Sequence, residues 1–328
     1  MMRVGLVGAG FVTRHHLIGW RALHPRAKVV AIADPAIERA LDRASEFDIP
    51  NVAGSAEELL DRFEIDALDV ASPRETHAHA VLLAARRGIP VLCQKPLTPT
   101  LEEARRLVDQ VGGGTRLMVH ENWRFRRYYR EAKRWLDTGA AGRVVQARMT
   151  LLSSGLVADA LGKLPGLERQ PFMRTLDRML VMEVLIHHLD TLRFLLGPLT
   201  VEASRIGRTC AQIRGEDHAM VTLATAEGAP VILHGNMAAH GHPPALRDRL
   251  EILGERSTIA FEEGRLTAVG LETRDTAYDL AETYQGSYNA AIGHFLDAVL
   301  SGAPFETAPA DNLETLALVE RIYALDGR

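Results

Sequence analysis

Apolar runs of strand type alternate with helical stretches as far as residue 121, and this rhythm constrains the fold more than any other feature of the chain. Strands that alternate with helices form a parallel sheet, because each helix carries the chain back to the start of the next strand. We therefore predict a doubly wound α/β domain at residues 1–121. The predicted strands are Val4–Val7, Val29–Ala33, Ala67–Ala71, Val91–Cys93 and Leu117–Val119. The predicted helices are His15–Leu23, Ile37–Glu46, Ala56–Phe63, Thr76–Arg87 and Leu101–Val111.

The pattern changes after residue 121 to one helix followed by long strand-type runs that are joined mainly by turns. Such runs form an antiparallel sheet with one face on helices, and we expect the other face to be apolar and to bind a second copy of the chain. We predict that residues 122–328 form an α+β domain for substrate binding and oligomerisation, in a homodimer or homotetramer. Its predicted strands are Arg143–Leu152, Val201–Ala211, Ala219–Ala226, Val231–Ala239 and Leu250–Phe261, and its last helices are Ser287–Leu300 and Leu313–Leu325.

A glycine turn joins the first predicted strand to the first predicted helix. Gly8 and Gly10 let the backbone turn sharply and approach a pyrophosphate, which the amide groups at the helix start, near Phe11 and Val12, can bind. The second strand runs into Asp34, at the separation expected for the carboxylate that binds the adenosine ribose hydroxyls. These features predict a Rossmann domain that binds NAD. In the alternative interpretation the glycines only form a turn and Asp34 only caps the next helix.

Lys95 follows a predicted strand within the tripeptide Gln94-Lys95-Pro96. Ligands of open parallel sheets bind beyond the carboxyl ends of the strands, so a lysine in this place can reach a bound substrate. Its ammonium group can donate a hydrogen bond to a reacting oxygen. Taken alone, a lysine after a strand is more often solvated, and the neighbouring cofactor-binding signature is what favours a catalytic role.

A histidine and a carboxylate share one face of a predicted helix that opens at Glu183 and stops at Gly197-Pro198. Glu183 and His187 are four residues apart, which places both on the same face. Because a histidine changes charge near neutral pH, His187 is a candidate general base that Glu183 orients. His188 points elsewhere. The alternative interpretation is a hydrogen-bonded core histidine beside an exposed one.

With these segments in this order, the chain resembles the Gfo/Idh/MocA family, named for glucose-fructose oxidoreductase, inositol dehydrogenase and rhizopine catabolism. The resemblance covers nearly the whole length. It is carried by Gly8–Thr13, Asp34-Pro35, the Ala71-Ser72-Pro73 turn with His77, Val91–Thr98, Asn122–Phe125, Gly139–Val144 and Glu183–Gly197. The sequence departs from the family pattern at Gln94, where the family has glutamate, and at Glu183, where it has aspartate.

The resemblance implies an NAD-dependent dehydrogenase that oxidises a hydroxyl of a sugar, a polyol or a related small polyhydroxylated molecule by hydride transfer. It implies catalytic roles for Lys95, His187 and Glu183, and a cis peptide bond before Pro96. The cofactor-binding residues that we expect are Gly8, Gly10, Phe11, Val12, Asp34, Ser72, His77, Gln94 and Lys95. The substrate-binding residues that we expect are Asn122, Trp123, Arg124, Glu183 and His187.

A structural scaffold subunit is disfavoured, because scaffolding does not require Gly8, Gly10 and Asp34 together. Two other functions remain open at the level of sequence. In one, NAD oxidises a sugar transiently so that a glycosidic bond is eliminated, as in some relatives, and no NADH accumulates. In the other, the chain is an NAD-binding sensor without turnover, which the presence of Lys95 and His187 disfavours.

Composition fits a soluble enzyme. A formal charge of -4 gives no overall basic field for nucleic acid. A local group of arginines is interpreted first as a solvated helix face or an oligomer contact; it consists of Arg124, Arg126, Arg127 and Arg130. The only cysteines are Cys93 and Cys210, which fits a reducing, cytoplasmic compartment. No apolar run approaches a membrane span, and the histidines lack the spacing of metal ligands, so we expect neither membrane nor metal.

Asp34 predicts which dinucleotide the chain prefers. A carboxylate that accepts from the ribose hydroxyls repels a 2'-phosphate, so NAD should bind at least about tenfold more tightly than NADP, or about 1.4 kcal/mol. Titration of both dinucleotides by fluorescence or calorimetry measures the ratio. Equal affinities, or a preference for NADP, would contradict the role of Asp34.

Overall fold

The computed structural model describes residues 1–271 and 273–327, and the chain divides into two compact units. Unit 1 comprises Met1–Phe125 and Ala281–Leu316, and unit 2 comprises Arg126–Leu280 and the segment from Ala317 onward. This division differs from the predicted boundary after residue 121, because most of helix α9 (Leu280–Ser301) and the start of α10 (Pro309–Asp326) belong to unit 1.

Unit 1 is built on a six-stranded parallel sheet with the order β3-β2-β1-β4-β5-β6. The strand order reverses between β1 and β4, as in a doubly wound sheet, so the predicted fold of this part is confirmed. The strands are β1 (Met2–Val7), β2 (Ala27–Ala33), β3 (Asn51–Ala53), β4 (Ala67–Val70), β5 (Val91–Gln94) and β6 (Leu117–His120). Strand β3 was not predicted, because its three residues are too few to show a periodic pattern.

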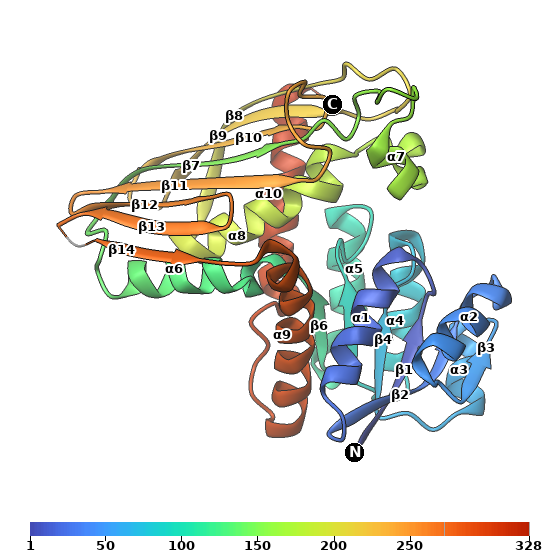
Figure 1. The fold of residues 1–328 in the computed structure, drawn as a ribbon. Helices are drawn as coiled ribbons and strands as arrows, with labels where there is room; N and C mark the ends of the chain where they lie inside the picture. Colours follow the sequence, from blue (N-terminus) through green and yellow to red (C-terminus); the bar gives the residue numbers. More distant parts are fainter. Residues whose placement is uncertain (272, 328) are drawn as a thin grey trace. The chain divides into compact units, whose positions relative to one another are not determined.

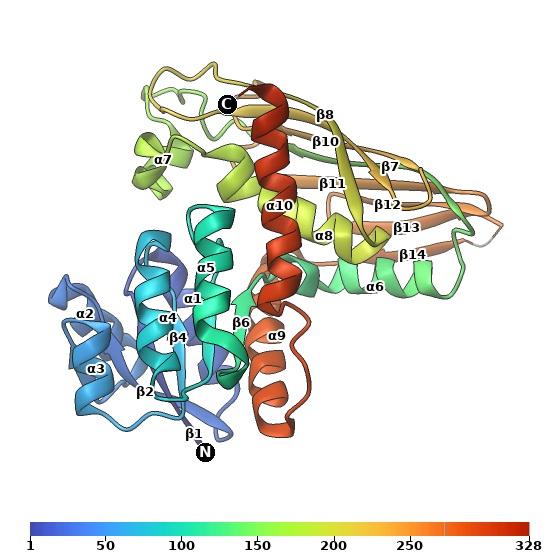
Figure 2. The same cartoon turned by 180° about the vertical axis from the view of Figure 1, so that it is seen from behind.

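Helices cover both faces of this sheet (Figures 1 and 2). They are α1 (Phe11–Ala22), α2 (Ile37–Phe47), α3 (Ala56–Arg62), α4 (His77–Ala85) and α5 (Leu101–Val111). Helix α9 returns from the far end of the sequence to complete the core: Phe295 lies edge to face with Trp20 at 6.1 Å between ring centroids. Both rings are buried, and this burial explains why a carboxyl-terminal helix belongs to unit 1.

Unit 2 is built on an eight-stranded sheet with the order β14-β13-β12-β11-β7-β10-β9-β8. All neighbouring pairs are antiparallel except β7 and β10, so the predicted mostly antiparallel sheet is confirmed. The strands are β7 (Val144–Leu152), β8 (Leu199–Gly207), β9 (His218–Thr225), β10 (Pro230–Asn236), β11 (Arg247–Gly254), β12 (Ser257–Glu262), β13 (Arg265–Gly270) and β14 (Arg274–Ala277). The single strand predicted at Leu250–Phe261 is wrong, because the chain turns back between β11 and β12.

One face of the eight-stranded sheet packs on helices α6 (Arg127–Asp137) and α8 (Ile186–Leu196) and on the last part of α10 (Figure 1). Side chains alternate along the strands, so Val221, Leu233 and Met149 point to this face and are fully buried. Helix α10 is fixed to β8 by hydrogen bonds from Ser204 Oγ to the Ile322 carbonyl and from the Ile206 amide to Asp326.

The opposite face of this sheet is not covered by a helix of unit 2 within the described residues. It exposes Met220 and Ile232, which are 56% and 38% accessible. It also carries ion pairs between neighbouring strands, such as that between Arg148 and Glu251 at 3.0 Å. The expectation of an apolar face is therefore wrong, because charged pairs alternate with the apolar side chains.

Candidate functional site

The glycine turn after β1 is fitted closely to the loop after β4. Gly8 has a φ of +104°, and a Cβ atom at this position would lie 2.6 Å from the Ala71 carbonyl oxygen. No other residue fits here without moving the backbone. Gly10, in contrast, is the exposed N-cap of α1, and a Cβ there would meet nothing within 4 Å.

The start of α1 has the features of an anion-binding helix terminus. Its N-cap is a glycine without a side-chain hydrogen bond, and the first turn contains no acidic residue. The amide groups of Phe11 and Val12 lie in this turn, where an anion is stabilised by free N–H groups and by the helix dipole. Thr13, which stands where the dinucleotide fingerprint prefers a smaller residue, is buried and donates a hydrogen bond to the Gly8 carbonyl at 3.0 Å. These residues fit the pyrophosphate of NAD.

Asp34 follows β2 and ties two loops together. Its Oδ2 accepts from the Ala9 amide at 2.7 Å and its Oδ1 accepts from the Ala36 amide at 2.8 Å. The carboxylate is only partly buried, and each oxygen has a further lone pair for a ribose hydroxyl. Asp34 does not cap α2, because the N-cap of this helix is Ala36 and has no side-chain cap hydrogen bond. Asp34 instead ties the two loops together and keeps the capacity for the predicted cofactor contact.

The loop after β5 places Lys95 at the edge of the sheet where the glycine turn after β1 and Asp34 after β2 also lie, which we call the rim of unit 1. The Lys95-Pro96 peptide bond is cis, which confirms the prediction. Gln94 is buried, and its Oε1 accepts from the Lys95 amide at 2.8 Å. The buried ring of His77 contacts the carbonyl oxygens of Pro96 at 3.0 Å and Ser72 at 2.8 Å, and so joins this loop to the one after β4. Ser72 is partly buried, with its hydroxyl 2.7 Å from that of Thr76.

The three residues predicted to bind substrate after β6 are buried in unit 1. Asn122 donates from its amide to Ser287 Oγ at 2.8 Å, and the Trp123 amide donates to Glu121 at 3.2 Å. Arg124 forms an ion pair with Asp311 at 2.7 Å and donates to the Glu306 carbonyl. The interpretation of the arginine group as a solvated face is therefore wrong for Arg124, which is 5% exposed.

In unit 2, Glu183 and His187 lie at the junction of two kinds of helix. Residues Leu180–Leu185 form a π-helical turn, and α8 follows directly at Ile186. The predicted helix start at Glu183 therefore lies inside an irregular turn, a feature that is frequent at functional sites. Glu183 is partly buried, and His187 is buried with 8% exposure.

Glu216 holds the start of this π-helical turn. Its Oε1 accepts from the Val181 amide at 3.0 Å and from the Tyr323 hydroxyl at 2.6 Å. Burial, together with the charge of Glu216, raises the pKa of Tyr323, so the phenol stays protonated and donates. The backbone that carries Glu183 is thereby fixed to the strand region before β9 and to α10.

A second buried carboxylate, Asp248 on β11, holds α8. It accepts from His188 Nε2 at 3.1 Å and from the Tyr129 hydroxyl at 3.2 Å, and it pairs with Arg126 at 2.6 Å. Burial favours the neutral acid, but the hydrogen bond from His188 and the charge of Arg126 outweigh it and hold the pKa of Asp248 below its usual value. His188 is thus a buried structural partner of Asp248, and Arg126 is a buried ion-pair partner rather than a solvated side chain.

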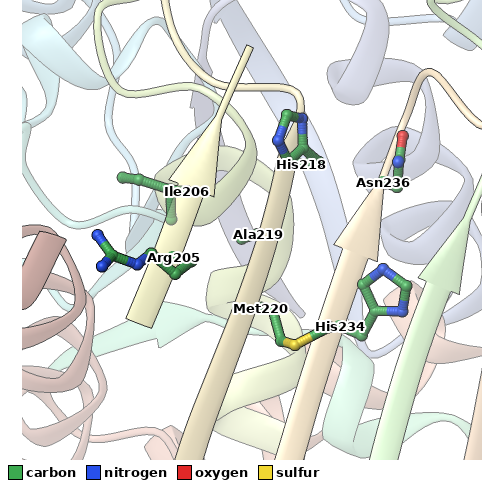
Figure 3. A pocket seen from close by; sticks show the side chains of 7 residues that line it. All are labelled: Arg205, Ile206, His218, Ala219, Met220, His234 and Asn236. Carbon is green, nitrogen blue, oxygen red and sulfur yellow. The ribbon is translucent and has the colours of Figure 1, made fainter. Parts of the chain in front are cut away.

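Unit 2 also has an open hollow of about 240 Å³ on β8, β9 and β10. Figure 3 shows His218 projecting from β9 and His234 and Asn236 from β10. Burial and the neighbouring His218 lower the pKa of His234. In the part of the chain that the structure describes, no group of three or more His, Cys, Asp or Glu side chains is arranged to hold a metal ion. None of the helices in residues 1–271 and 273–327 combines the length and apolar character needed to cross a bilayer.

Unit 1 has the architecture and the rim of an NAD-binding Rossmann domain. Residues 2–119 match the model of an oxidoreductase family with an NAD-binding Rossmann fold, and residues 129–260 match the carboxyl-terminal domain of GFO/IDH/MocA proteins. The chain belongs to the Gfo/Idh/MocA family of NAD-dependent oxidoreductases, as the sequence resemblance implied.

Curated relatives match over nearly their full length. The chain is 31% identical to a D-apiose dehydrogenase of Paraburkholderia graminis, over 98% of this chain and 88% of the relative. It is 30% identical to inositol 2-dehydrogenase 4 of Saccharopolyspora erythraea, over 92% of this chain and 86% of the relative.

Solved structures share the fold. An oxidoreductase from Agrobacterium radiobacter, crystallised with NAD+, L-tartaric acid and magnesium, has a TM-score of 0.91 and 28% identity, over 100% of this chain and 96% of that one. A levoglucosan dehydrogenase in complex with NADH and levoglucosan has a TM-score of 0.84 and 21% identity, over 99% and 97% of the two chains.

The Asp248 cluster predicts a pH-dependent contribution to stability. Asp248→Asn removes the buried carboxylate that pairs with Arg126 and should lower the free energy of unfolding by about 3 kcal/mol at pH 7. Because the pKa of Asp248 is lower in the folded than in the unfolded chain, its contribution is complete above about pH 4 and is lost as the pH falls through the folded value. The difference between parent and variant should therefore shrink below about pH 4.

Urea unfolding followed by circular dichroism at several pH values measures this difference. The control is Asp275→Asn, which removes the carboxylate of an exposed pair with Arg265 and should change stability little. A difference that stays constant down to about pH 3 would show that the charge of Asp248 is not what stabilises unit 2.

Proposed function

We propose that this chain oxidises a hydroxyl group of a sugar, a polyol or a related small polyhydroxylated molecule, with NAD as the oxidant. The observation that carries the proposal is Lys95, which follows β5 at the rim where the glycine turn and Asp34 also lie. A cofactor-binding rim alone fits any dinucleotide protein, whereas a cationic donor at that rim fits chemistry on an oxygen. The relatives act on compounds of this class, as the names D-apiose dehydrogenase and inositol 2-dehydrogenase state.

In the proposed reaction Lys95 donates a hydrogen bond to the substrate oxygen that becomes a carbonyl. Its ammonium stabilises the negative charge that develops on this oxygen as the proton leaves. His187 accepts the hydroxyl proton as general base, and Glu183 orients the imidazole or the substrate. NAD, when bound, accepts the hydride from the carbon atom. His187 then holds the proton until it is released to solvent.

The other residues of the site contact NAD or lie on the substrate side. The pyrophosphate lies against Gly8, Gly10 and the first amides of α1, and the ribose hydroxyls contact Asp34. On the cofactor side of the site, His77 joins the Ser72 loop after β4 to the loop after β5, where Gln94 holds the Lys95 amide. Asn122, Trp123 and Arg124 act on the substrate side. With two free cysteines, Cys93 and Cys210, the protein is proposed to work in the cytoplasm.

The second candidate is a redox-neutral reaction of the same site, in which oxidation is transient and a glycosidic bond is eliminated. It uses the same Lys95 and His187, and the accumulation of NADH distinguishes the two reactions. An NAD-binding sensor would bind the dinucleotide and show neither activity. A panel of aldoses, polyols and inositols with NAD, followed by NADH absorbance, tests all three.

Catalysis is tested by substitutions at Lys95 and His187. Lys95→Ala and His187→Ala should each lower kcat by about a hundredfold or more, the usual loss for a positioned acid or base. NAD affinity should change far less, because neither side chain is needed to hold the phosphates. Glu183→Gln should have a smaller effect, since it keeps the shape and removes only the charge.

Turnover and NAD affinity are measured in the same variants, with the best substrate of the panel. If His187→Ala turns over like the parent, His187 is a core histidine and the proposed base is wrong. If the variant also loses NAD binding, the substitution has damaged the fold.

The chain is further proposed to assemble as a homodimer or homotetramer through the outer face of the eight-stranded sheet. The exposed side chains of Met220 and Ile232 on this face support the proposal, because an interface there would remove them from water. Sedimentation at micromolar concentration should show a species of at least twice 36.0 kDa. Ile232→Asp should shift it toward the monomer, and the control Leu300→Lys, on an exposed leucine of α9, should not. A parent protein that sediments only as a monomer would contradict the proposal.

A further inference from the structure

A continuous line of hydrogen-bonding groups runs through unit 1 from the core to the backbone of Lys95. Trp20 Nε1 donates to Asp69 Oδ2 at 2.7 Å, and His16 Nδ1 lies 2.8 Å from the same oxygen. His16 Nε2 is 3.5 Å from Gln94 Nε2, and Gln94 Oε1 accepts from the Lys95 amide at 2.8 Å. These groups come from α1, β4 and β5, so the line crosses the centre of the parallel sheet.

The backbone N–H of Lys95 determines the orientation of the Gln94 amide and, through it, which ring nitrogen of His16 carries the proton. A backbone N–H can only donate, so the Gln94 atom that faces Lys95 is the carbonyl oxygen. The Gln94 amide nitrogen then faces His16 and must donate, so His16 Nε2 is an acceptor and carries no proton. The proton of the ring lies on Nδ1, where the Asp69 carboxylate accepts it.

The burial of these polar groups indicates a role in orienting Gln94 rather than in stabilising the fold. His16 and Asp69 are both completely buried, and Gln94 is 7% exposed. Two apolar side chains of similar volume would stabilise the fold about as well as a buried polar pair. What an apolar pair cannot supply is an acceptor aimed at Gln94.

We propose that His16 is a positioning residue for Lys95, acting through Gln94: Asp69 fixes the tautomer of His16, and His16 fixes the orientation of the Gln94 amide that holds the Lys95 backbone. The inference rests on the catalytic role proposed for Lys95. It adds a residue of α1 and a residue of β4 to the groups that determine turnover, although neither is placed in contact with substrate or cofactor.

The surroundings of His16 supply few other charges. Asp69 faces it from β4 and Gln94 from β5, while the rings of His120 from β6 and Tyr288 from α9 pack against it at 4.3 and 5.6 Å between centroids. A carboxylate at position 94 would accept from both sides and would require a second proton on His16. Gln94→Glu should therefore convert His16 from the neutral Nδ1–H tautomer to an imidazolium.

The proton position is measured first, without reference to activity. In the NAD-bound, ¹⁵N-labelled protein at pH 7, two-bond ¹H–¹⁵N spectra should show His16 protonated at Nδ1 only, and Gln94→Glu should protonate both nitrogens. His16→Asn identifies the signals. A proton on Nε2 in the parent would overturn the proposal whatever the role of Lys95.

Two substitutions then separate positioning from structural support. His16→Asn places its amide near the Nδ1 position and keeps the contact with Asp69, whereas His16→Gln reaches the Nε2 position and keeps the contact with Gln94. If His16 positions Lys95, the asparagine variant should lose about five- to tenfold in kcat, the scale of one hydrogen bond, with substrate KM and NAD Kd within about twofold. The glutamine variant should stay within about twofold in kcat.

Controls keep the outcomes distinct. His79→Asn and His79→Gln change an exposed histidine that pairs with Glu57, and both should leave kcat unchanged. If His16→Asn keeps the parent kcat while His16→Gln loses it, His16 only satisfies Asp69 and the proposal is wrong; equal losses in both also overturn it. If Lys95→Ala itself turns over like the parent, the proposed function of Lys95 fails, and the NMR result still decides the hydrogen-bond line.

Discussion

The parallel direction of six strands is the constraint on which the functional rim of unit 1 depends. Because all these strands run the same way, the segments that follow them emerge at one edge of the sheet. The glycine turn after β1, Asp34 after β2, the Ser72 loop after β4 and Lys95 after β5 therefore meet there, although they are far apart in the sequence. Short contacts between these loops, such as Asp34 to the Ala9 amide and His77 to the Pro96 carbonyl, then fix the rim.

Buried carboxylates that accept from more than one donor recur in both units. Asp69 accepts from Trp20 and His16 in unit 1, and Asp248 accepts from His188 and Tyr129 in unit 2. A buried charge is costly unless partners surround it, so each carboxylate requires the elements that supply its donors to stay in register. In unit 1 the donors lie on α1, which follows the glycine turn, and in unit 2 the donor His188 lies on α8, which also carries His187.

Local sequence was sufficient for much of the fold and for part of the site. Helix α5 has the predicted bounds because Thr100 and Glu103 form a capping box that marks its start. The positions of Gly8 in a tight turn and of Asp34 after the second strand were predictable because both are local signals, whereas their contacts with NAD stay a prediction. The cis peptide bond before Pro96 followed from family resemblance and was confirmed.

Long-range contacts account for what the sequence did not predict. The return of α9 to unit 1 depends on Trp20 and Phe295, and the π-helical turn at Glu183 depends on Glu216, which lies after β8 in the sequence. Asp69 stands inside an otherwise apolar strand, and that isolated carboxylate was the available signal for the buried partner His16. Only the folded structure shows that the histidine that pairs with Asp69 is His16.

The two cysteines lie in environments so different that a thiol reagent should modify one and not the other. Cys93 is fully buried next to Gln94, and burial together with the charge of Asp69 raises its pKa well above the usual thiol value. The thiolate that alkylating reagents require is therefore scarce at this position, and the reagent has no access to it. Cys210 is partly exposed in unit 2. A maleimide dye added to the native protein consequently attaches to unit 2 alone, and the loop that carries Lys95 stays unlabelled.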